Sequence, residues 1–160
     1  MSESPRDEPR DEAGAVADTV ADTVTDTVTD TPQMARGVVI THGTLGQGLI
    51  DAVARIAGGD TDALVAVSNA DCSPEDLQRR IGEAMAGRAG PLLLFTDLGA
   101  GSCTLAARLT CRERGAVPVV TGVNLPMLLD FVFHRDLPVD ELAERLCDKG
   151  REGVRVMNTA

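Results

Sequence analysis

The sequence has 160 residues, 43 % of them hydrophobic, and a formal net charge of −10. This length suits one ordinary domain, and no apolar run approaches the roughly 18 residues needed to cross a membrane. The first residues are acids, arginines and prolines, without the basic and apolar regions of a signal peptide. We therefore expect a soluble, single-domain, cytoplasmic protein.

Several function classes are excluded by composition. The sequence has no basic patch, no Trp or Tyr and only three Phe, whereas nucleic-acid binders need positive charge and aromatic stacking surfaces. Its single lysine, Lys149, is not part of the Gly-Lys-Ser/Thr motif of a phosphate-binding P-loop. The four cysteines lack C-x-x-C spacing, and neither histidine has a cysteine or acid cluster close by in the sequence. We expect reduced thiols, no metal site, no cofactor and no nucleic-acid partner.

Most of the negative charge lies at the start of the chain. Residues 1–32 hold nine acids and two arginines, and from Val16 to Thr31 a four-residue pattern of Val, Ala or Thr, Asp and Thr repeats. These residues are weak helix formers and supply no core. We predict that residues 1–34 are a disordered acidic tail and that residues 35–160 form the domain; a tethering or partner-binding tail is the alternative.

Beyond the tail, apolar β-rich runs alternate with helical patterns. The strands are expected at 37–41, 63–68, 91–96 and 116–121, and the helices at 45–57, 73–86, 102–114, 126–134 and 139–149. Ser73 followed by Pro74 is a typical helix start. Because these runs are mainly apolar, they are typical of a parallel sheet that is buried on both faces. We predict an α/β fold: a doubly wound, mainly parallel four-stranded sheet with helices on both faces.

Two polar residues follow neighbouring strands of this predicted sheet. His42 follows the first strand and Asp97 follows the third. In open α/β sheets the functional crevice lies beyond the carboxyl ends of the strands, where the strand order reverses. With the common order 2-1-3-4, His42 and Asp97 face each other across that crevice. A carboxylate bonded to one imidazole nitrogen leaves the other nitrogen as a nucleophile or base.

An anion cradle is expected beside them. Gly99, Gly101 and Ser102 come at the start of the third helix, where backbone N–H groups, a hydroxyl and the helix dipole attract an anion. A nucleophilic imidazole beside such a cradle indicates a phosphohistidine. From position alone, a structural or solvent-facing histidine is an equal alternative.

Four motifs carry a family resemblance: G-V-V-I-T-H-G at 37–43, D-L-G-A-G-S at 97–102, G-V-N-L-P-M-L at 122–128 and G-R-E-G-V at 150–154. In their order and spacing they resemble the mannose-type enzyme IIA domain of the bacterial phosphoenolpyruvate:sugar phosphotransferase system. The resemblance spans nearly all of residues 37–154. The family motif reads roughly D-x-x-G-G-S-P, so Ala100 and Cys103 here replace a glycine and a proline. We expect these changes to affect the transfer rate rather than the fold.

The resemblance implies the chemistry and the partners. It implies that His42 accepts a phosphoryl group on Nε2 from the histidine-containing phosphocarrier protein and passes it to a IIB component, with membrane IIC and IID components associated indirectly. Asp97 matches the acid that orients the histidine, and Gly101 and Ser102 match the phosphate-binding motif. The resemblance also implies a homodimer that exchanges a C-terminal antiparallel edge strand, for which residues 154–157 are the candidate.

Three alternatives stay open. The same phosphohistidine serves as a regulatory signal in an incomplete phosphotransferase system, or the chain is the phosphoryl-donor subunit of dihydroxyacetone kinase, which resembles this fold. The third alternative is a cysteine hydrolase. Cys103 lies at the expected helix N-terminus, which favours a thiolate, and His42 and Asp97 are its expected neighbours.

Overall fold

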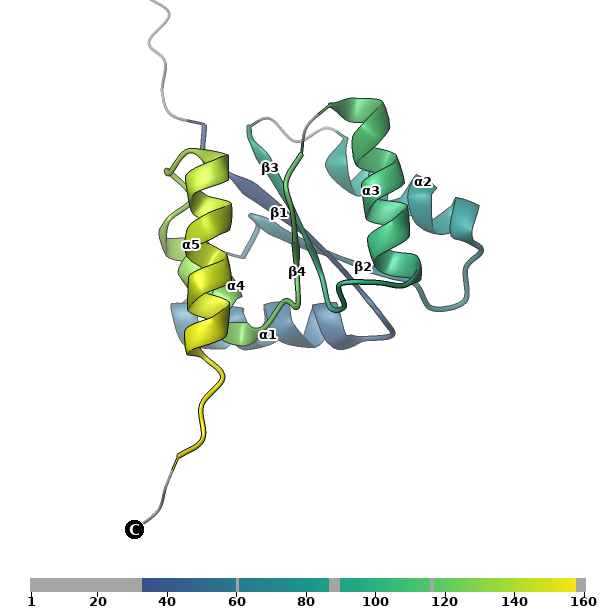
Figure 1. The fold of residues 1–160 in the computed structure, drawn as a ribbon. Coiled ribbons are helices and arrows are strands. Elements are labelled where there is room, and N and C mark those ends of the chain that lie inside the picture. The colour runs from purple at the N-terminus through teal and green to yellow at the C-terminus, as the bar shows by residue number, and fades with distance from the viewer. Residues whose placement is uncertain (1–32, 60, 87–89, 116, 158–160) are drawn as a thin grey trace, which may run out of the picture.

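The computed structural model describes residues 33–59, 61–86, 90–115 and 117–157. Almost all of the predicted acidic tail and Ala116 of the predicted fourth strand lie outside the described residues. Strands and helices alternate along the chain (Figure 1). Their order is β1 (Arg36–Thr41), α1 (Leu45–Ala57), β2 (Leu64–Ser68), α2 (Pro74–Met85), β3 (Leu92–Thr96), α3 (Ser102–Arg114), β4 (Val119–Thr121), α4 (Leu125–Phe133) and α5 (Val139–Glu152).

The four strands form one parallel sheet in the order β2-β1-β3-β4. This confirms the predicted fold class and the strand order on which the expected site depends. The chain winds outward in opposite directions from β1 and β3, so the crevice between their carboxyl ends is the switch point of the fold. That crevice is where His42 and Asp97 lie.

Helices cover both faces of the sheet. α2 and α3 lie on one face, and α1, α4 and α5 lie on the other (Figure 1). Successive strand residues point to opposite faces: Val39 and Phe95 pack under α1, α4 and α5, while Val38 and Leu94 pack under α2 and α3. The strands are therefore apolar between their polar end residues, because helices cover both faces of the sheet.

The larger of the two cores centres on Phe131 of α4. Its ring is fully buried and packs edge-on against Phe95 of β3, with 5.5 Å between ring centroids and an angle of 87°. We predict that Phe131→Ala lowers the free energy of unfolding by about 3–5 kcal/mol, because it leaves a cavity between α4 and the sheet. Urea denaturation measures this change.

The matched control is Phe133→Ala on the same helix. The Phe133 side chain is 65 % exposed, so its loss should change the free energy of unfolding by no more than about 0.5 kcal/mol. Equal losses for both variants would contradict the assigned core.

Element ends agree with the sequence prediction to within three residues. β4 begins later than expected, at Val119, because Pro118 has no N–H to donate to the ladder; its carbonyl still accepts from Leu94 N–H at 3.0 Å. The predicted N-cap of α2 is confirmed, since the Ser73 hydroxyl accepts from Asp76 N–H at 3.1 Å.

The C-terminal segment of residues 154–157 forms no strand within the single described chain. It extends away from α5 (Figure 1), and the side chains of Val154, Val156 and Met157 are 80–91 % exposed. Exchange of this segment involves a second chain and stays a prediction. Among the described residues, no helix is both long and apolar enough to cross a membrane.

Candidate functional site

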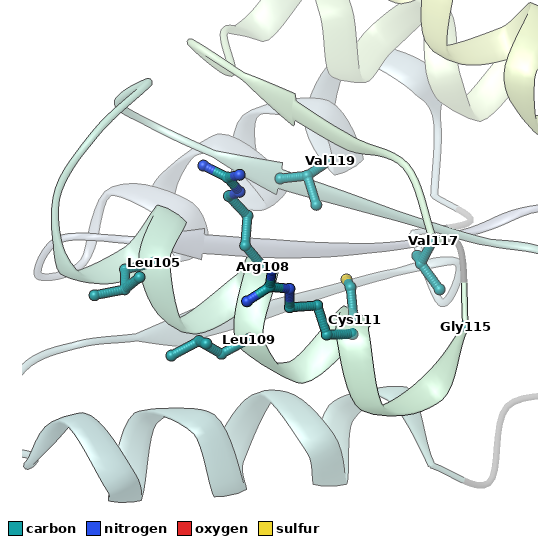
Figure 2. A pocket seen from close by; sticks show the side chains of 8 residues that line it. Leu105, Arg108, Leu109, Cys111, Gly115, Val117 and Val119 are labelled. Atoms are coloured by element: carbon teal, nitrogen blue, oxygen red, sulfur yellow. The ribbon is translucent and has the colours of Figure 1, made fainter.

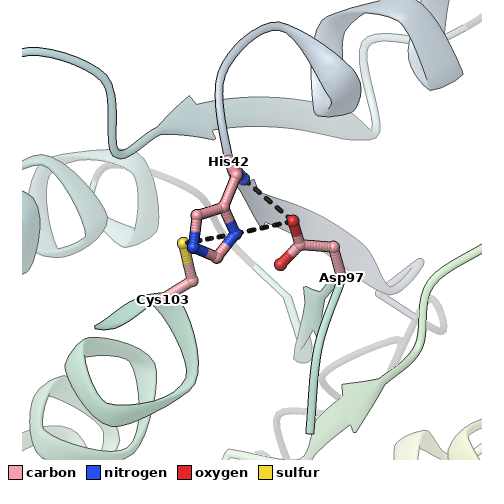
Figure 3. A group of neighbouring side chains, drawn as sticks. All are labelled: His42, Asp97 and Cys103. Atoms are coloured by element: carbon pink, nitrogen blue, oxygen red, sulfur yellow. Dashed lines mark hydrogen bonds and ion pairs between the residues drawn. The ribbon is translucent and has the colours of Figure 1, made fainter. Parts of the chain in front are cut away.

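A hydrogen-bonded pair of His42 and Asp97 occupies the switch point. Each follows directly on the last residue of its strand, β1 or β3. His42 Nδ1 donates to Asp97 Oδ2 at 2.8 Å, and the His42 backbone N–H donates to the same oxygen at 2.9 Å (Figure 3). The fold thus brings together two residues that are 55 positions apart in the sequence, in the arrangement expected for them.

This hydrogen bond selects the tautomer of the neutral His42 imidazole. Because Nδ1–H donates to the carboxylate, the neutral ring carries its free lone pair on Nε2. Nε2 forms no hydrogen bond with any residue that the structure describes. The His42 side chain is 45 % exposed, whereas that of Asp97 is only 10 % exposed. The site thus presents an accessible nitrogen lone pair, which can act as a nucleophile, on a ring that is hydrogen-bonded to a shielded carboxylate.

The carboxyl group of Asp97 is ionised at neutral pH. Burial raises its pKa, but the hydrogen bonds from the backbone and ring of His42 outweigh this effect and hold the pKa below its usual range. A negative charge therefore lies beside Nδ1, where it stabilises any positive charge that develops on the ring.

Local hydrogen bonds hold both loops of the site. After β1, Gly46 N–H donates to Thr41 Oγ1 at 2.7 Å, and a Cβ at Gly46 would lie 2.9 Å from that oxygen. After β3, the buried hydroxyls of Thr96 and Thr104 both donate to the Leu98 carbonyl, at 3.0 and 2.5 Å. These contacts fix the positions of the residues next to His42 and Asp97.

The predicted anion cradle lies at the N-terminus of α3. Gly101 precedes the helix with a φ of 111°, a conformation that favours glycine, and Ser102 is the first helical residue. Asn69, which follows β2, donates from Nδ2 to Ser102 Oγ at 3.4 Å and accepts from Gly43 N–H at 3.3 Å. Asn69 therefore links the cradle to the loop of His42.

Sequence reasoning missed Asn69. The signal was present, because Asn69 is a polar residue directly after a mainly apolar strand, as His42 and Asp97 are. Thr104 was also missed, and nothing in its spacing distinguishes it from other helical threonines.

Cys103 is the third side chain at the imidazole. Its Sγ lies 3.9 Å from His42 Nδ1 (Figure 3), and one donor atom from each of His42, Asp97 and Cys103 lies within 4.8 Å of the other two. The expectation of no metal site considered only distance along the sequence, whereas in space His42 has both a carboxylate and a cysteine beside it.

The environment of Cys103 does not favour a thiolate. The residue is 1 % exposed, and burial, together with the charge of Asp97, raises the pKa of its thiol. The effect expected from the helix N-terminus is therefore outweighed. Cys103 lies close to His42, as the cysteine-hydrolase alternative requires. The raised pKa of its thiol does not favour the thiolate that such an enzyme uses as its nucleophile.

Comparison with known proteins places this chain in a family. Residues 37–147 match the family EIIA-man, PTS system fructose IIA component. The search of curated proteins found no match. This family match includes all of β1 except Arg36, the crevice with His42 and Asp97, and most of α5.

Solved structures share the fold. The mannose/sorbose-specific IIA subunit of the phosphotransferase system from Enterococcus faecalis superposes with a TM-score of 0.72 at 22 % identity, covering 79 % of this chain and 97 % of that one. Phosphotransferase system component EIIA from Streptococcus agalactiae has a TM-score of 0.70 at 23 % sequence identity. The match covers 77 % of this chain and 97 % of that one. A sigma-54 interaction domain protein from Enterococcus faecalis has a TM-score of 0.65 at 11 % sequence identity. The match covers 77 % of this chain and 95 % of that one. At these sequence identities the solved structures show a shared fold. The family match covers more than half of the sequence, so the chain belongs to the EIIA-man family of phosphotransferase-system IIA components.

Proposed function

We propose that this IIA component is a phosphohistidine carrier of a phosphoenolpyruvate-dependent sugar phosphotransferase system. His42 accepts the phosphoryl group from the histidine-containing phosphocarrier protein and passes it to a IIB component. The observation that carries the proposal is the 2.8 Å hydrogen bond between His42 Nδ1 and Asp97 Oδ2, which leaves the lone pair on Nε2 of a half-exposed ring.

The transfer step follows from this arrangement. The Nε2 lone pair attacks the phosphorus atom held on the carrier's histidine; the new N–P bond forms as the old one breaks, and its electron pair returns to the carrier's ring. His42 becomes a cationic ring with Nδ1–H and Nε2–phosphoryl, and the charge of Asp97 stabilises that cation. Such transfers depend on positioning and charge stabilisation rather than on further covalent chemistry.

Gly101 and Ser102 are the proposed phosphate-binding residues. Ser102 opens a 13-residue helix, and no side chain in the described part of the protein caps that end. The backbone N–H groups of the first turn and the Ser102 hydroxyl are therefore available to phosphoryl oxygens.

Exposed leucines beside the site support a protein partner. Leu45, Leu98 and Leu105 are 47, 56 and 60 % exposed, and each lies within three residues of His42, Asp97 or Ser102 in the sequence. Apolar side chains around a reactive group are typical of a docking surface. We infer a cytoplasmic protein that docks the phosphocarrier and IIB here and meets the membrane components IIC and IID only indirectly.

Phosphoryl transfer tests the proposal directly. The full chain is mixed with enzyme I, its cognate phosphocarrier and labelled phosphoenolpyruvate. We expect label that is labile in acid and stable in base, as a phosphohistidine is. No label in the presence of a competent cognate carrier would contradict the proposal.

A regulatory phosphoacceptor is the second candidate. The observation that favours it is that the fold also occurs in a protein named as a sigma-54 interaction domain protein. Both candidates require phosphorylation of His42, but only the transport role requires onward transfer. Discharge of the labelled protein by a cognate IIB component supports transport.

We also propose the homodimer. β4 ends the sheet order, so one of its edges is unpaired within the described chain. An open groove of about 630 Å³ lies beside it, between Leu105 and Arg108 of α3 and Val117 and Val119 (Figure 2). The exposed segment of residues 154–157 of a second copy has the extended, apolar character needed to pair there.

Truncation tests this exchange. Removing residues 154–160 should convert the dimer to a monomer in analytical ultracentrifugation at micromolar concentration, because the exchanged strand is lost. Removing only residues 158–160 is the control and should leave the dimer. A monomeric full chain, or a dimer that survives the longer truncation, would contradict the exchange.

A further inference from the structure

Three side chains of different chemistry converge at the head of α3. His42 offers an imidazole nitrogen, Asp97 a carboxylate oxygen and Cys103 a sulfur, all within 4.8 Å of one another. Nitrogen, oxygen and sulfur donors in this combination are typical of zinc and other borderline-soft divalent metals. Magnesium and calcium are disfavoured, because they require shells composed mainly of oxygen.

The distances suit a tetrahedral ion. Bonds of about 2.0–2.3 Å place neighbouring donors roughly 3.3–3.8 Å apart. Cys103 Sγ and His42 Nδ1 are 3.9 Å apart, so they need to approach by only a few tenths of an ångström. His42 Nδ1 and Asp97 Oδ2 are 2.8 Å apart and need to separate, as their hydrogen bond is replaced by two bonds to the ion.

The burial of the three residues suits an open site. Cys103 and the Asp97 side chain are 1 and 10 % exposed, while the His42 side chain is 45 % exposed. The first two form a buried floor, and the imidazole forms the exposed side of the cluster. Asp97 Oδ1 already accepts from Leu98 N–H at 3.0 Å, which orients Oδ2 toward the ion. Three protein donors leave the fourth position to water.

We propose that His42, Asp97 and Cys103 bind a zinc-like divalent cation, and that the bound cation prevents phosphorylation of His42. The second half of this inference rests on the proposed function. On binding, the Cys103 thiol releases its proton to water, and the Nδ1 proton of His42 is replaced by one on Nε2 through solvent. The metal then holds the Nδ1 lone pair and Nε2 carries a proton, so no lone pair remains to attack phosphorus.

Cobalt(II) is the probe for metal binding. The untagged full chain is titrated with Co²⁺ under reducing conditions, and absorption is recorded in the near-ultraviolet, where a thiolate bound to cobalt gives a charge-transfer band. We expect the band in the wild type and its displacement by Zn²⁺. Cys103→Ser should abolish the band and weaken zinc binding by more than the roughly 10–100-fold that loss of an outer-shell partner costs.

Cys111→Ser is the matched control. Cys111 is also a buried cysteine of α3 but is not part of the donor cluster, so this variant should keep the band. No band in the wild type, or a band that survives Cys103→Ser, would overturn the metal site.

A second arm tests the block on phosphorylation. Isolated phosphorylated carrier is presented to the chain with and without saturating Zn²⁺, so that enzyme I never meets the metal. We expect zinc to slow phosphorylation of the wild type at least tenfold and to slow that of Cys103→Ser much less. Cobalt binding without inhibition by zinc would overturn the block. Absence of phosphorylation even without metal would instead count against the proposed function, while the cobalt band decides the metal site independently.

Discussion

His42→Gln is expected to take up no phosphoryl group from the phosphorylated carrier. The glutamine amide is similar in size to the imidazole but has no nucleophilic nitrogen lone pair. Because Nε2 is the proposed attacking atom, the rate should fall by at least about a thousandfold, below detection in a labelling assay. Incorporation of label from phosphorylated carrier, followed on a denaturing gel at neutral pH, measures this.

The second histidine provides a sharp control, since the chain has only two. His134 ends α4, where its Nδ1 donates to the Asp130 carbonyl at 2.9 Å. His134→Gln should therefore keep the wild-type labelling. Label that persists in His42→Gln but disappears in His134→Gln would transfer the phosphorylation site to α4 and contradict the proposed mechanism.

Asp97→Asn should slow phosphorylation by about 10²–10⁴-fold without abolishing it. The amide carries no charge to stabilise the cationic ring that forms as Nε2 takes the phosphoryl group. The amide oxygen, in the place of Oδ2, still accepts from the His42 backbone N–H and from Nδ1–H, so the loop, the ring orientation and the fold should be retained. Single-turnover phosphorylation by isolated phosphorylated carrier measures the rate.

Asp148→Asn is the control for loss of an acid. Asp148 lies on the exposed surface of α5, paired with Arg151 at 2.9 Å, and its loss should leave the rate within about twofold, because surface pairs contribute little. An unchanged rate in Asp97→Asn, with normal folding by circular dichroism, would remove Asp97 from the mechanism.

The sequence predicted most of the fold because its local signals agree with one another. The bounds predicted for α1 and α3 agree with the structure, since apolar periodicity and glycine-rich flanks coincide there. The strand runs carry polar residues only at their ends, so nothing within them misleads the assignment. Only the predicted strand at 116–121 is clearly too long. β4 begins at Val119, because Pro118 has no N–H to pair with the neighbouring strand.

The site was predictable where it depends on topology. Polar residues at the carboxyl ends of strands that flank a switch point come together in any sheet of this order, and His42 and Asp97 do so across 55 residues. The proximity of Cys103 to the imidazole was expected only for the cysteine-hydrolase alternative and not as a set of metal donors, since the contact depends on how the loop after β3 turns into α3. Sequence spacing separates Cys103 from His42 by 61 residues, so a rule based on local ligand spacing cannot find the cluster.

The nitrogen that carries the phosphoryl group tests the central claim most directly. The chain is labelled with ¹⁵N-histidine, phosphorylated with phosphoenolpyruvate, enzyme I and carrier, and examined by long-range ¹H–¹⁵N correlation spectroscopy. The orientation of His42 by Asp97 predicts one shifted imidazole whose phosphoryl group is on Nε2 and whose Nδ1 stays protonated. A phosphoryl group on Nδ1, or phosphorylated protein with both histidine spectra unchanged, would contradict the account.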